Sequence, residues 1–417
     1  MKSMVRALRH RNFRLYFSGQ IVSLVGTWMQ QVAMSWLAYR LSDSVWVLGV
    51  VGFASQIPIL LFAPLGGIFS DRFNRHRLIV VTQILSMIQA FILTALTMTH
   101  TVAVWHLVML STFLGLVNAI DGPARQSFAV LLVDKREDLA NAIALNSFTF
   151  NAARLVGPAA AGLVVGWLGE GACFLLNGLS YVAVLIALAK VRVHDPRHQP
   201  APIFLGLKEG FLYVASSRPI RSLLLIVSVM SLCVSPFVVL MPYYAREVFH
   251  GDARMLGLLT GCSGVGALSG SLFLASRKQV AVLGRYVAAA SCIGATALMA
   301  FSVSRLLWLT LPLIVLLGFG LIVTAASTNV LIQSLVPDHL RGRAMSLYTM
   351  AFLGMMPVGS LINGRIASYV GVPATLFGAG LIAIACVAWL RRGLAGMGEH
   401  VERAGAAPIA RSPASTT

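Results

Sequence analysis

Two ionisable side chains, Asp121 and Arg154, lie within long apolar segments of the chain. A charged group in an apolar medium is costly, so such groups usually serve a function. Asp121 could bind and release a proton, because burial favours its uncharged form. It could instead be a static ion-pair partner of Arg72, Arg75 or Arg125, and such pairing would oppose proton binding. Proton carriage and ion pairing are therefore both open roles for this carboxyl group.

Arg154 lies about twelve residues into the apolar segment 141–167, a depth of roughly 18 Å at the helical rise per residue. A guanidinium at that depth requires a polar cavity, an acid or an anionic ligand. It could bind an anionic substrate, or pair with Asp121 once in a conformational cycle. The alternatives are a structural salt bridge and a bond to the backbone carbonyls that Pro158 leaves free.

Polar side chains recur at near-helical spacing in three apolar segments. They are Gln20, Ser23, Thr27, Gln30 and Gln31, then Asn146, Ser147 and Asn151, then Thr324, Ser327, Thr328 and Asn329. A polar stripe that faced lipid would leave hydrogen-bonding groups unsatisfied, so we expect these stripes to line a cavity or a helix contact. Met355, with Met345, Met350 and Met356, could add an adaptable apolar wall, or could be core filling.

The elements that hold these side chains are predicted to be membrane-spanning helices. Of the 417 residues, 58% are hydrophobic and only 11% are charged, whereas soluble domains carry about 25% charged residues. Apolar runs predict an all-α membrane protein with twelve spans. The runs are 14–38, 46–69, 78–99, 103–122, 141–167, 172–190, 220–242, 255–276, 282–302, 306–334, 343–369 and 372–390.

The basic residues behind the net charge of +18 are distributed as in membrane proteins, where Lys and Arg concentrate in the loops on the cytoplasmic side. Most Lys and Arg residues fall in alternate intervals between the spans, which predicts that both termini are cytoplasmic. They form no single face or stripe, so nucleic acid is not an expected partner. We expect a multi-pass protein of the bacterial cytoplasmic (inner) membrane, with the lipid bilayer as its surroundings.

The longest interval predicts two halves. We expect a six-helix half at 1–190, a cytoplasmic linker at 191–219, a second six-helix half at 220–392 and a disordered tail at 393–417. The linker has an apolar repeat that could form an amphipathic interfacial helix, or it could be a partly ordered connection. A shift of 202 residues superposes Ala142 on Ala344, Leu145 on Leu347, Phe150 on Phe352, Gly157 on Gly359 and Gly162 on Gly364. This repeat favours two parallel halves.

The loop 67–77 reads Gly67-Ile-Phe-Ser-Asp71-Arg72-Phe-Asn-Arg75-His-Arg77. It resembles the GxxxDRxGRR signature of the major facilitator superfamily, with Asn at position 74 in place of the second glycine. The resemblance implies that Gly67, Asp71, Arg72, Arg75 and Arg77 form a gate that closes the cytoplasmic side in the outward-facing state. The alternative is a solvated basic loop.

The segment 153–162 resembles the antiporter motif of exporters in that superfamily through Gly157, Pro158 and Gly162. The resemblance implies that a bend at Pro158 seals the cavity. The stretches 118–126, 139–147, 174–177 and 336–348 are similar to the branch of enterobactin exporters and macrolide-efflux proteins. Members of this branch move unlike cargoes, so the resemblance names no substrate.

We therefore expect a secondary active exporter of an amphipathic small molecule, such as a drug, a macrolide-like compound or a siderophore. It would work by alternating access and proton-coupled antiport, with protons as the second partner. The alternatives are a carrier for a lysolipid or similar lipid, and a non-transporting membrane receptor of the same fold.

Several functions are not expected. The sequence has no GxxxxGK[ST], HExxH or GxSxG motif, so we expect neither ATP hydrolysis nor another enzyme activity. The five cysteines are odd in number and have no CxxC spacing, so neither a metal site nor a disulfide framework is indicated. No cofactor is expected, and the protein is expected to be monomeric.

Overall fold

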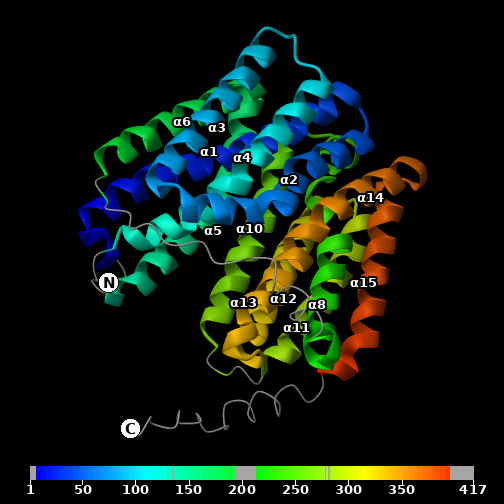
Figure 1. Ribbon diagram of the computed structural model, residues 1–417. Helices are drawn as coiled ribbons and strands as arrows, with labels where there is room; N and C mark the ends of the chain where they lie inside the picture. Colours follow the sequence, from blue (N-terminus) through cyan, green and yellow to red (C-terminus); the bar gives the residue numbers. More distant parts are fainter. Residues whose placement is uncertain are drawn as a thin grey trace, which may run out of the picture.

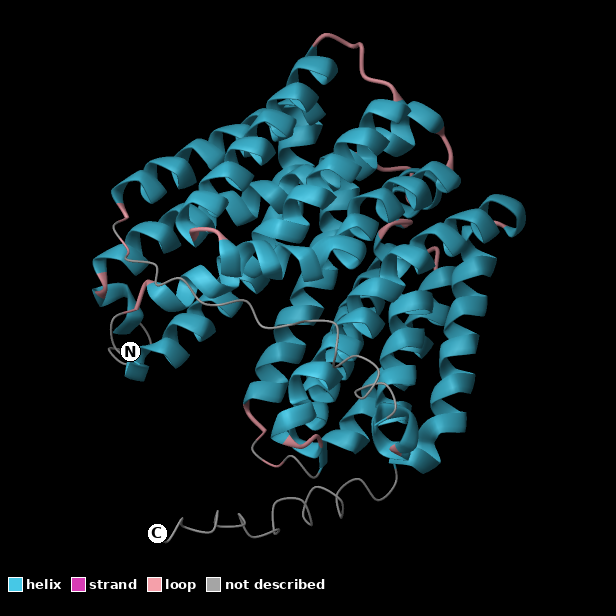
Figure 2. Ribbon diagram, in the orientation of Figure 1, coloured by secondary structure: helices cyan, strands magenta, loops and turns pink. Residues whose placement is uncertain are grey.

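The structure is a computed structural model that describes residues 6–133, 136–191, 193, 213–277, 279 and 282–394. Every element in this part of the chain is helical, as Figure 2 shows. Most of the predicted linker helix and nearly all of the predicted tail lie outside the described residues.

The first half of the chain contains six long helices. They are α1 (Arg11–Ser42), α2 (Val45–Arg72), α3 (Arg75–Met98), α4 (Val104–Leu131), α5 (Arg136–Leu168) and α6 (Glu170–Lys190). In the second half, the regular helices are α8 (Arg218–Val229), α10 (Ala253–Ala275), α11 (Leu283–Val303), α12 (Leu307–Leu335), α13 (Asp338–Thr349), α14 (Met355–Val370) and α15 (Val372–Leu394).

Two spans of the second half are irregular. The span 218–248 contains π turns at Met230–Val234 and Tyr244–Val248, with a 3-10 turn, Ser235–Val238, and the short α9, Met241–Tyr243, between them. Pro236 and Pro242 remove backbone donors in this stretch, which explains the loss of regular geometry. A further π turn, Met350–Gly354, joins α13 to α14.

In the described part of the chain, eleven helical segments are long and apolar enough to cross a membrane. This confirms an all-helical membrane protein and most of the predicted spans. The prediction placed the end of the fourth span at residue 122, but α4 continues to Leu131. The first helix, α1, has 32 residues, but its polar stripe lowers its hydropathy. Its crossing of the membrane, and hence the twelfth span, remains a prediction, as does the cytoplasmic position of the termini.

The helices form two bundles, α1–α6 and α8–α15, that lie against each other in Figure 1. The predicted repeat is visible in the helix bounds. Arg136–Leu168 of the first bundle corresponds to Asp338–Val370 of the second, with an offset of 202 residues at both ends. The helices that follow, α6 and α15, begin with the same offset. These bounds support the predicted duplication.

The two bundles meet mainly through two helix pairs, α5 with α10 and α2 with α14. Glycines allow the close approach: a Cβ atom on Gly257 would lie 2.6 Å from the carbonyl oxygen of Pro158, and one on Gly49 would lie 2.6 Å from that of Ser360. At one end of the molecule, Arg246 also bonds Asp43 across the bundles at 2.5 Å. We call this the closed end.

At the other end, where α1, α3 and α5 begin, the bundles diverge (Figure 1). We call this the open end. The predicted gate segment lies there, since Arg72 ends α2 and Arg75 begins α3. The two bundles are therefore in contact at the closed end and diverge at the open end.

Candidate functional site: a cavity between the two bundles

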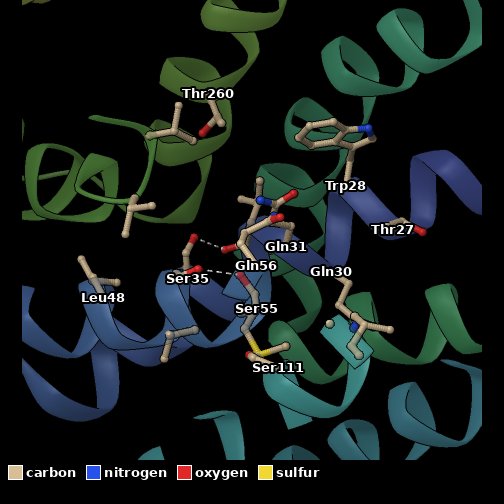
Figure 3. Close-up of a pocket in the computed structure, with 18 of the residues that line it drawn as sticks. Thr27, Trp28, Gln30, Gln31, Ser35, Leu48, Ser55, Gln56, Ser111 and Thr260 are labelled. Carbon is tan, nitrogen blue, oxygen red and sulfur yellow. Dashed lines mark hydrogen bonds between the residues drawn. The ribbon is translucent and has the colours of Figure 1, made fainter. Parts of the chain in front are cut away.

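A cavity of about 170 Å³ lies between the bundles, lined by α1, α2, α4, α10, α14 and the irregular segment near Val238. Figure 3 shows its side chains converging from several helices. The walls are mainly apolar, with scattered amides and hydroxyls. These amides and hydroxyls include those of Thr27, Gln31, Ser35, Ser55, Gln56, Asn118 and Thr260. None of the lining residues carries a charge. Such a surface accepts an apolar body and orients it through a few hydrogen bonds.

The predicted polar stripe of α1 divides between the cavity and the helix contacts. Thr27, Gln30 and Gln31 line the cavity. Gln20 is 2% exposed and accepts a hydrogen bond from Arg125 at 2.7 Å, so it lies in a contact between helices. Both destinations keep the polar groups away from lipid, which is the physical requirement that the stripe indicated.

Gln30 also belongs to a buried amide network that joins four helices. Its side-chain nitrogen donates to Gln89 Oε1 at 2.9 Å, and Asn177 Nδ2 donates to its oxygen at 2.8 Å. Gln89 in turn donates to the Leu110 carbonyl at 3.3 Å. The network links α1, α3, α6 and α4 and so fixes the wall from which Gln31 projects.

We expect Gln30→Leu to lower the free energy of unfolding by about 1–2 kcal/mol, because it leaves the amides of Gln89 and Asn177 without their partner. Thermal denaturation of the purified protein in detergent would measure this. Gln31→Leu is the matched control: Gln31 faces the cavity, and no hydrogen bond of its side chain is present in the described part of the chain. It should leave stability unchanged and alter cargo affinity. Equal destabilisation by both variants would contradict the assignment.

Asp121 is 3% exposed and is held entirely within the first bundle. It accepts hydrogen bonds from Thr82 Oγ1 at 2.6 Å and from Gln83 Nε2 at 3.1 Å. It also forms an ion pair with Arg125, one turn later on α4. Of the partners that the sequence left open, the structure therefore shows Arg125. Because α4 extends to Leu131, Asp121 also lies deeper than its predicted position at the end of a span.

Among the described residues, three polar atoms around this ion pair have no hydrogen-bond partner. They are Tyr16 Oη, Gln20 Nε2 and Gln83 Oε1, all buried. Buried polar atoms usually have partners, and those without one often mark a water, an ion or a group that rearranges. The cluster thus has unused hydrogen-bonding capacity beside a buried carboxyl group. It could accommodate a change in the protonation of Asp121.

Arg154 is partly buried, and its guanidinium lies over the ring of Trp28, 5.8 Å from the ring centroid. The Trp28 ring itself meets Phe150 edge-on at 5.8 Å. Within the described ranges, no carboxylate lies within 4.0 Å of Arg154, and Asp121 is engaged by Arg125. An Asp121–Arg154 pair is therefore not formed in this state.

Two of the three residues of the predicted antiporter-like motif, Pro158 and Gly162, lie at the contact between the bundles. A Cβ atom on Gly162 would be 3.0 Å from the Ala253 carbonyl oxygen, and Pro158 supplies the carbonyl that faces Gly257. Gly157 packs on α1, where an added Cβ atom would collide with that of Trp28. Pro158 lies inside a continuous helix. The motif therefore shapes the seam between α5 and α10.

In the predicted gate segment, Arg75 is buried, whereas Arg72 and Arg77 are exposed. The surroundings of Gly67 and of the Asp71 side chain lie outside the described part of the structure. Asn74, which departs from the family signature, caps α3: its Oδ1 accepts the Arg77 backbone N–H at 3.0 Å. The departure thus retains a defined helix start. The gating role itself remains a prediction.

Four predicted cavity residues lie elsewhere. Asn146 is exposed, Asn151 donates to the Ser147 carbonyl on its own helix, and Asn329 accepts a bond from Gln333. Met355 is 37% exposed, and its neighbour Met356 lines the cavity instead. Any contact of these four residues with cargo would have to occur in another state or another part of the pathway.

The sequence did not indicate that Ser55, Gln56, Asn118 and Thr260 line the cavity, or that Gln89 belongs to the amide network. A signal was present on α3, where Thr82, Gln83, Ser86 and Gln89 share one helical face. On α2 and α10, isolated polar residues in apolar segments give no comparable stripe.

Comparison with known proteins supports this architecture. A family model described as transmembrane secretion effector matches residues 2–408. The staphyloferrin A transporter of Staphylococcus aureus is 26% identical over 87% of this chain and 91% of that protein. The multidrug efflux pump Tap of Mycolicibacterium fortuitum is 23% identical over 82% and 86%. Macrolide efflux protein A of Streptococcus pyogenes is 22% identical over 91% and 96%.

Solved structures show the same fold. A bacterial homologue of the lysosomal transporter Spinster, inward-facing and unoccupied, superposes with a TM-score of 0.67 at 14% identity, over 95% of each chain. An inward-facing bacterial homologue of ferroportin superposes with a TM-score of 0.66 at 18% identity, over 93% of this chain and 98% of that one. The chain is a multi-pass membrane transporter that belongs to the transmembrane secretion effector family of the major facilitator superfamily.

Proposed function

We propose that this protein is a secondary active exporter that moves amphipathic small molecules out of the cytoplasm in exchange for protons. The observation that carries the proposal is the uncharged, largely apolar cavity between two bundles that are closed at one end and diverge at the other. A rocking motion about the α5–α10 and α2–α14 seams would expose this cavity alternately to each side.

The cavity supports the cargo class. Its apolar walls and dispersed amides suit a molecule with an extended apolar body and a few polar groups. The relatives are a siderophore transporter, a multidrug pump and a macrolide-efflux protein, and each name describes transport of small molecules. Export by this chain is inferred from that group together with the cavity.

The Asp121 cluster supports proton coupling. Its carboxyl group is buried within one bundle, away from the cavity lining, so proton binding and cargo binding could use separate sites. Protonation would weaken the ion pair with Arg125 and release that guanidinium for another partner. Arg75, at the start of the neighbouring α3, is buried on the same side of the molecule.

The gate and the orientation form the last part of the proposal. With both termini cytoplasmic, the open end faces the cytoplasm and this structure is the inward-facing state. The segment 67–77, including Asp71 and Arg72, then lies where a cytoplasmic gate must close in the opposite state. The closed end, with the Asp43–Arg246 pair, would face the outside.

The test is uptake into everted membrane vesicles that contain the protein, using fluorescent cationic, neutral and carboxylate-bearing amphiphiles. We expect accumulation of at least one probe when the outside of the vesicle is at higher pH than its lumen, and collapse on addition of a protonophore. Vesicles without the protein are the control. Gradient-independent equilibration alone would remove proton coupling. Failure with every soluble probe, together with movement of labelled lysolipid, would favour the lipid carrier.

A further inference from the structure

None of the residues that line the cavity is charged. Near the cavity, however, one guanidinium has no acidic or hydrogen-bonding partner among the described residues. Arg125 is engaged by Asp121 and by Gln20. Arg154 differs. In the part of the chain that the structure describes, its guanidinium has neither a carboxylate within 4.0 Å nor a hydrogen-bond acceptor. It lies instead over the Trp28 ring. A ring face compensates a partly desolvated cation only weakly compared with an anion.

The Trp28 ring lies between the Arg154 guanidinium and the cavity. Trp28 is a lining residue, and Figure 3 shows its indole among the labelled side chains of the cavity. The Trp28 Cβ atom packs against Gly157, one turn after Arg154 on α5, so a larger residue at position 157 would collide with α1. A rotation of the indole about its side-chain bonds, with both helices in place, would expose the guanidinium towards the cavity.

The same residue lies at the seam between the bundles. A Cβ atom on Gly264 of α10 would be 2.9 Å from the Arg154 carbonyl oxygen. The Arg154 backbone therefore contacts the second bundle, while its side chain contacts α1 of the first. A ligand held by this guanidinium would therefore bind beside the contact between the two bundles.

We propose that Arg154 and the Trp28 ring form a subsite for an anionic head group, and that the preferred cargo is a carboxylate-bearing amphiphile. The apolar body would lie against Val32, Leu48 and Leu256, and the carboxylate would replace Trp28 as the partner of Arg154. Guanidinium and carboxylate match in a two-bond geometry that an ammonium cannot reproduce. This inference rests on the proposed function and specifies its substrate class.

The test compares N-dansyl-phenylalanine with its methyl ester, which differ only in the carboxylate. Binding to the purified protein is followed by dansyl fluorescence, and uptake is followed in everted vesicles. We expect the wild type to bind the acid more tightly than the ester. Arg154→Gln should weaken binding of the acid by about 10- to 100-fold, the effect of losing a charged hydrogen bond, and leave the ester unchanged. Arg154→Lys should restore part of the affinity for the acid.

Two results would overturn the proposal. One is wild-type protein that does not distinguish acid from ester, including binding of neither. The other is an Arg154→Gln variant that loses both ligands equally, which would mean that Arg154 supports the fold; thermal denaturation of the variant would show this directly. If cationic or neutral amphiphiles are still exported in either case, the subsite is refuted and the proposed export function stands. If nothing is transported, the export function fails as well.

Discussion

Gly257→Ala is expected to abolish most transport while leaving the protein folded. A Cβ atom at this position would lie 2.6 Å from the Pro158 carbonyl oxygen and 2.8 Å from Gly162 Cα. Both obstacles are backbone atoms, so the α5–α10 seam itself must open. Overpacking of this kind costs about 1–3 kcal/mol. If the seam is closed in only one of the two states, their ratio changes by about 5- to 150-fold.

The matched control is Gly261→Ala, one turn later on the same helix. A Cβ atom there meets only the Leu155 carbonyl oxygen, at 3.9 Å, which is an ordinary contact. Both variants gain the same helix propensity. A difference in transport between them therefore reflects the close contact between α5 and α10. Gly261→Ala should transport as the wild type does in everted vesicles.

The state change can be read separately from transport. In a background without the five cysteines, a cysteine placed at Ala253 would report opening of the seam, because Ala253 is 2% exposed and its carbonyl oxygen faces Gly162. We expect Gly257→Ala to increase its labelling by a membrane-impermeant thiol reagent applied to intact cells. A loss of transport without increased labelling would contradict the shift towards the open outer side.

The sequence was sufficient for the architecture, because the signals involved are local or repeated. Apolar runs of about 20 residues specify helices that must satisfy their own backbone. The offset of 202 residues, visible in a few identities, holds at both ends of the matching spans. The pairing of Asp121 with Arg125 was also among the local possibilities, since residues four apart face each other on a helix.

The cavity was less predictable, because it depends on the rotation of each helix. The π turn at Met350–Gly354 places one extra residue in a turn of the helix before α14. The side chains that follow are therefore rotated about the helix axis relative to those of a regular α-helix. As a result Met356, rather than Met355, lines the cavity. A regular 3.6-residue period carried through the whole span cannot reproduce that change.

Contacts between segments that are distant along the chain could not be predicted from the sequence. The Gln20–Arg125 bond joins residues 105 positions apart, and the Gln30–Asn177 bond joins residues 147 apart. The polar stripe of α1 indicated that its side chains needed partners, but not which helix supplied each one. The same stripe made α1 the least apolar of the long helices in the first bundle, so its crossing of the membrane rests on the fold.

Asp121→Asn is expected to eliminate accumulation driven by a pH gradient and to preserve exchange of labelled cargo across vesicles without a gradient. Asn has nearly the same volume, and its Oδ1 can still accept the bonds from Thr82 and Gln83. It cannot bind and release a proton. Transport would therefore continue downhill, but the energy of the proton gradient would no longer be coupled to it.

The ion pair with Arg125 provides the discriminating control. If Asp121 serves only to neutralise Arg125, Asp121→Asn leaves a buried, unpaired guanidinium, and both gradient-driven and exchange activities should fall. Removing that charge as well, in Asp121→Asn with Arg125→Gln, would then restore both activities. If Asp121 carries the proton, the double variant exchanges cargo but remains unable to use the gradient, because no second charge change can replace the missing carboxyl group. Restoration of gradient-driven uptake in the double variant would therefore assign Asp121 to the structure of the bundle and direct the search for the proton site to another residue.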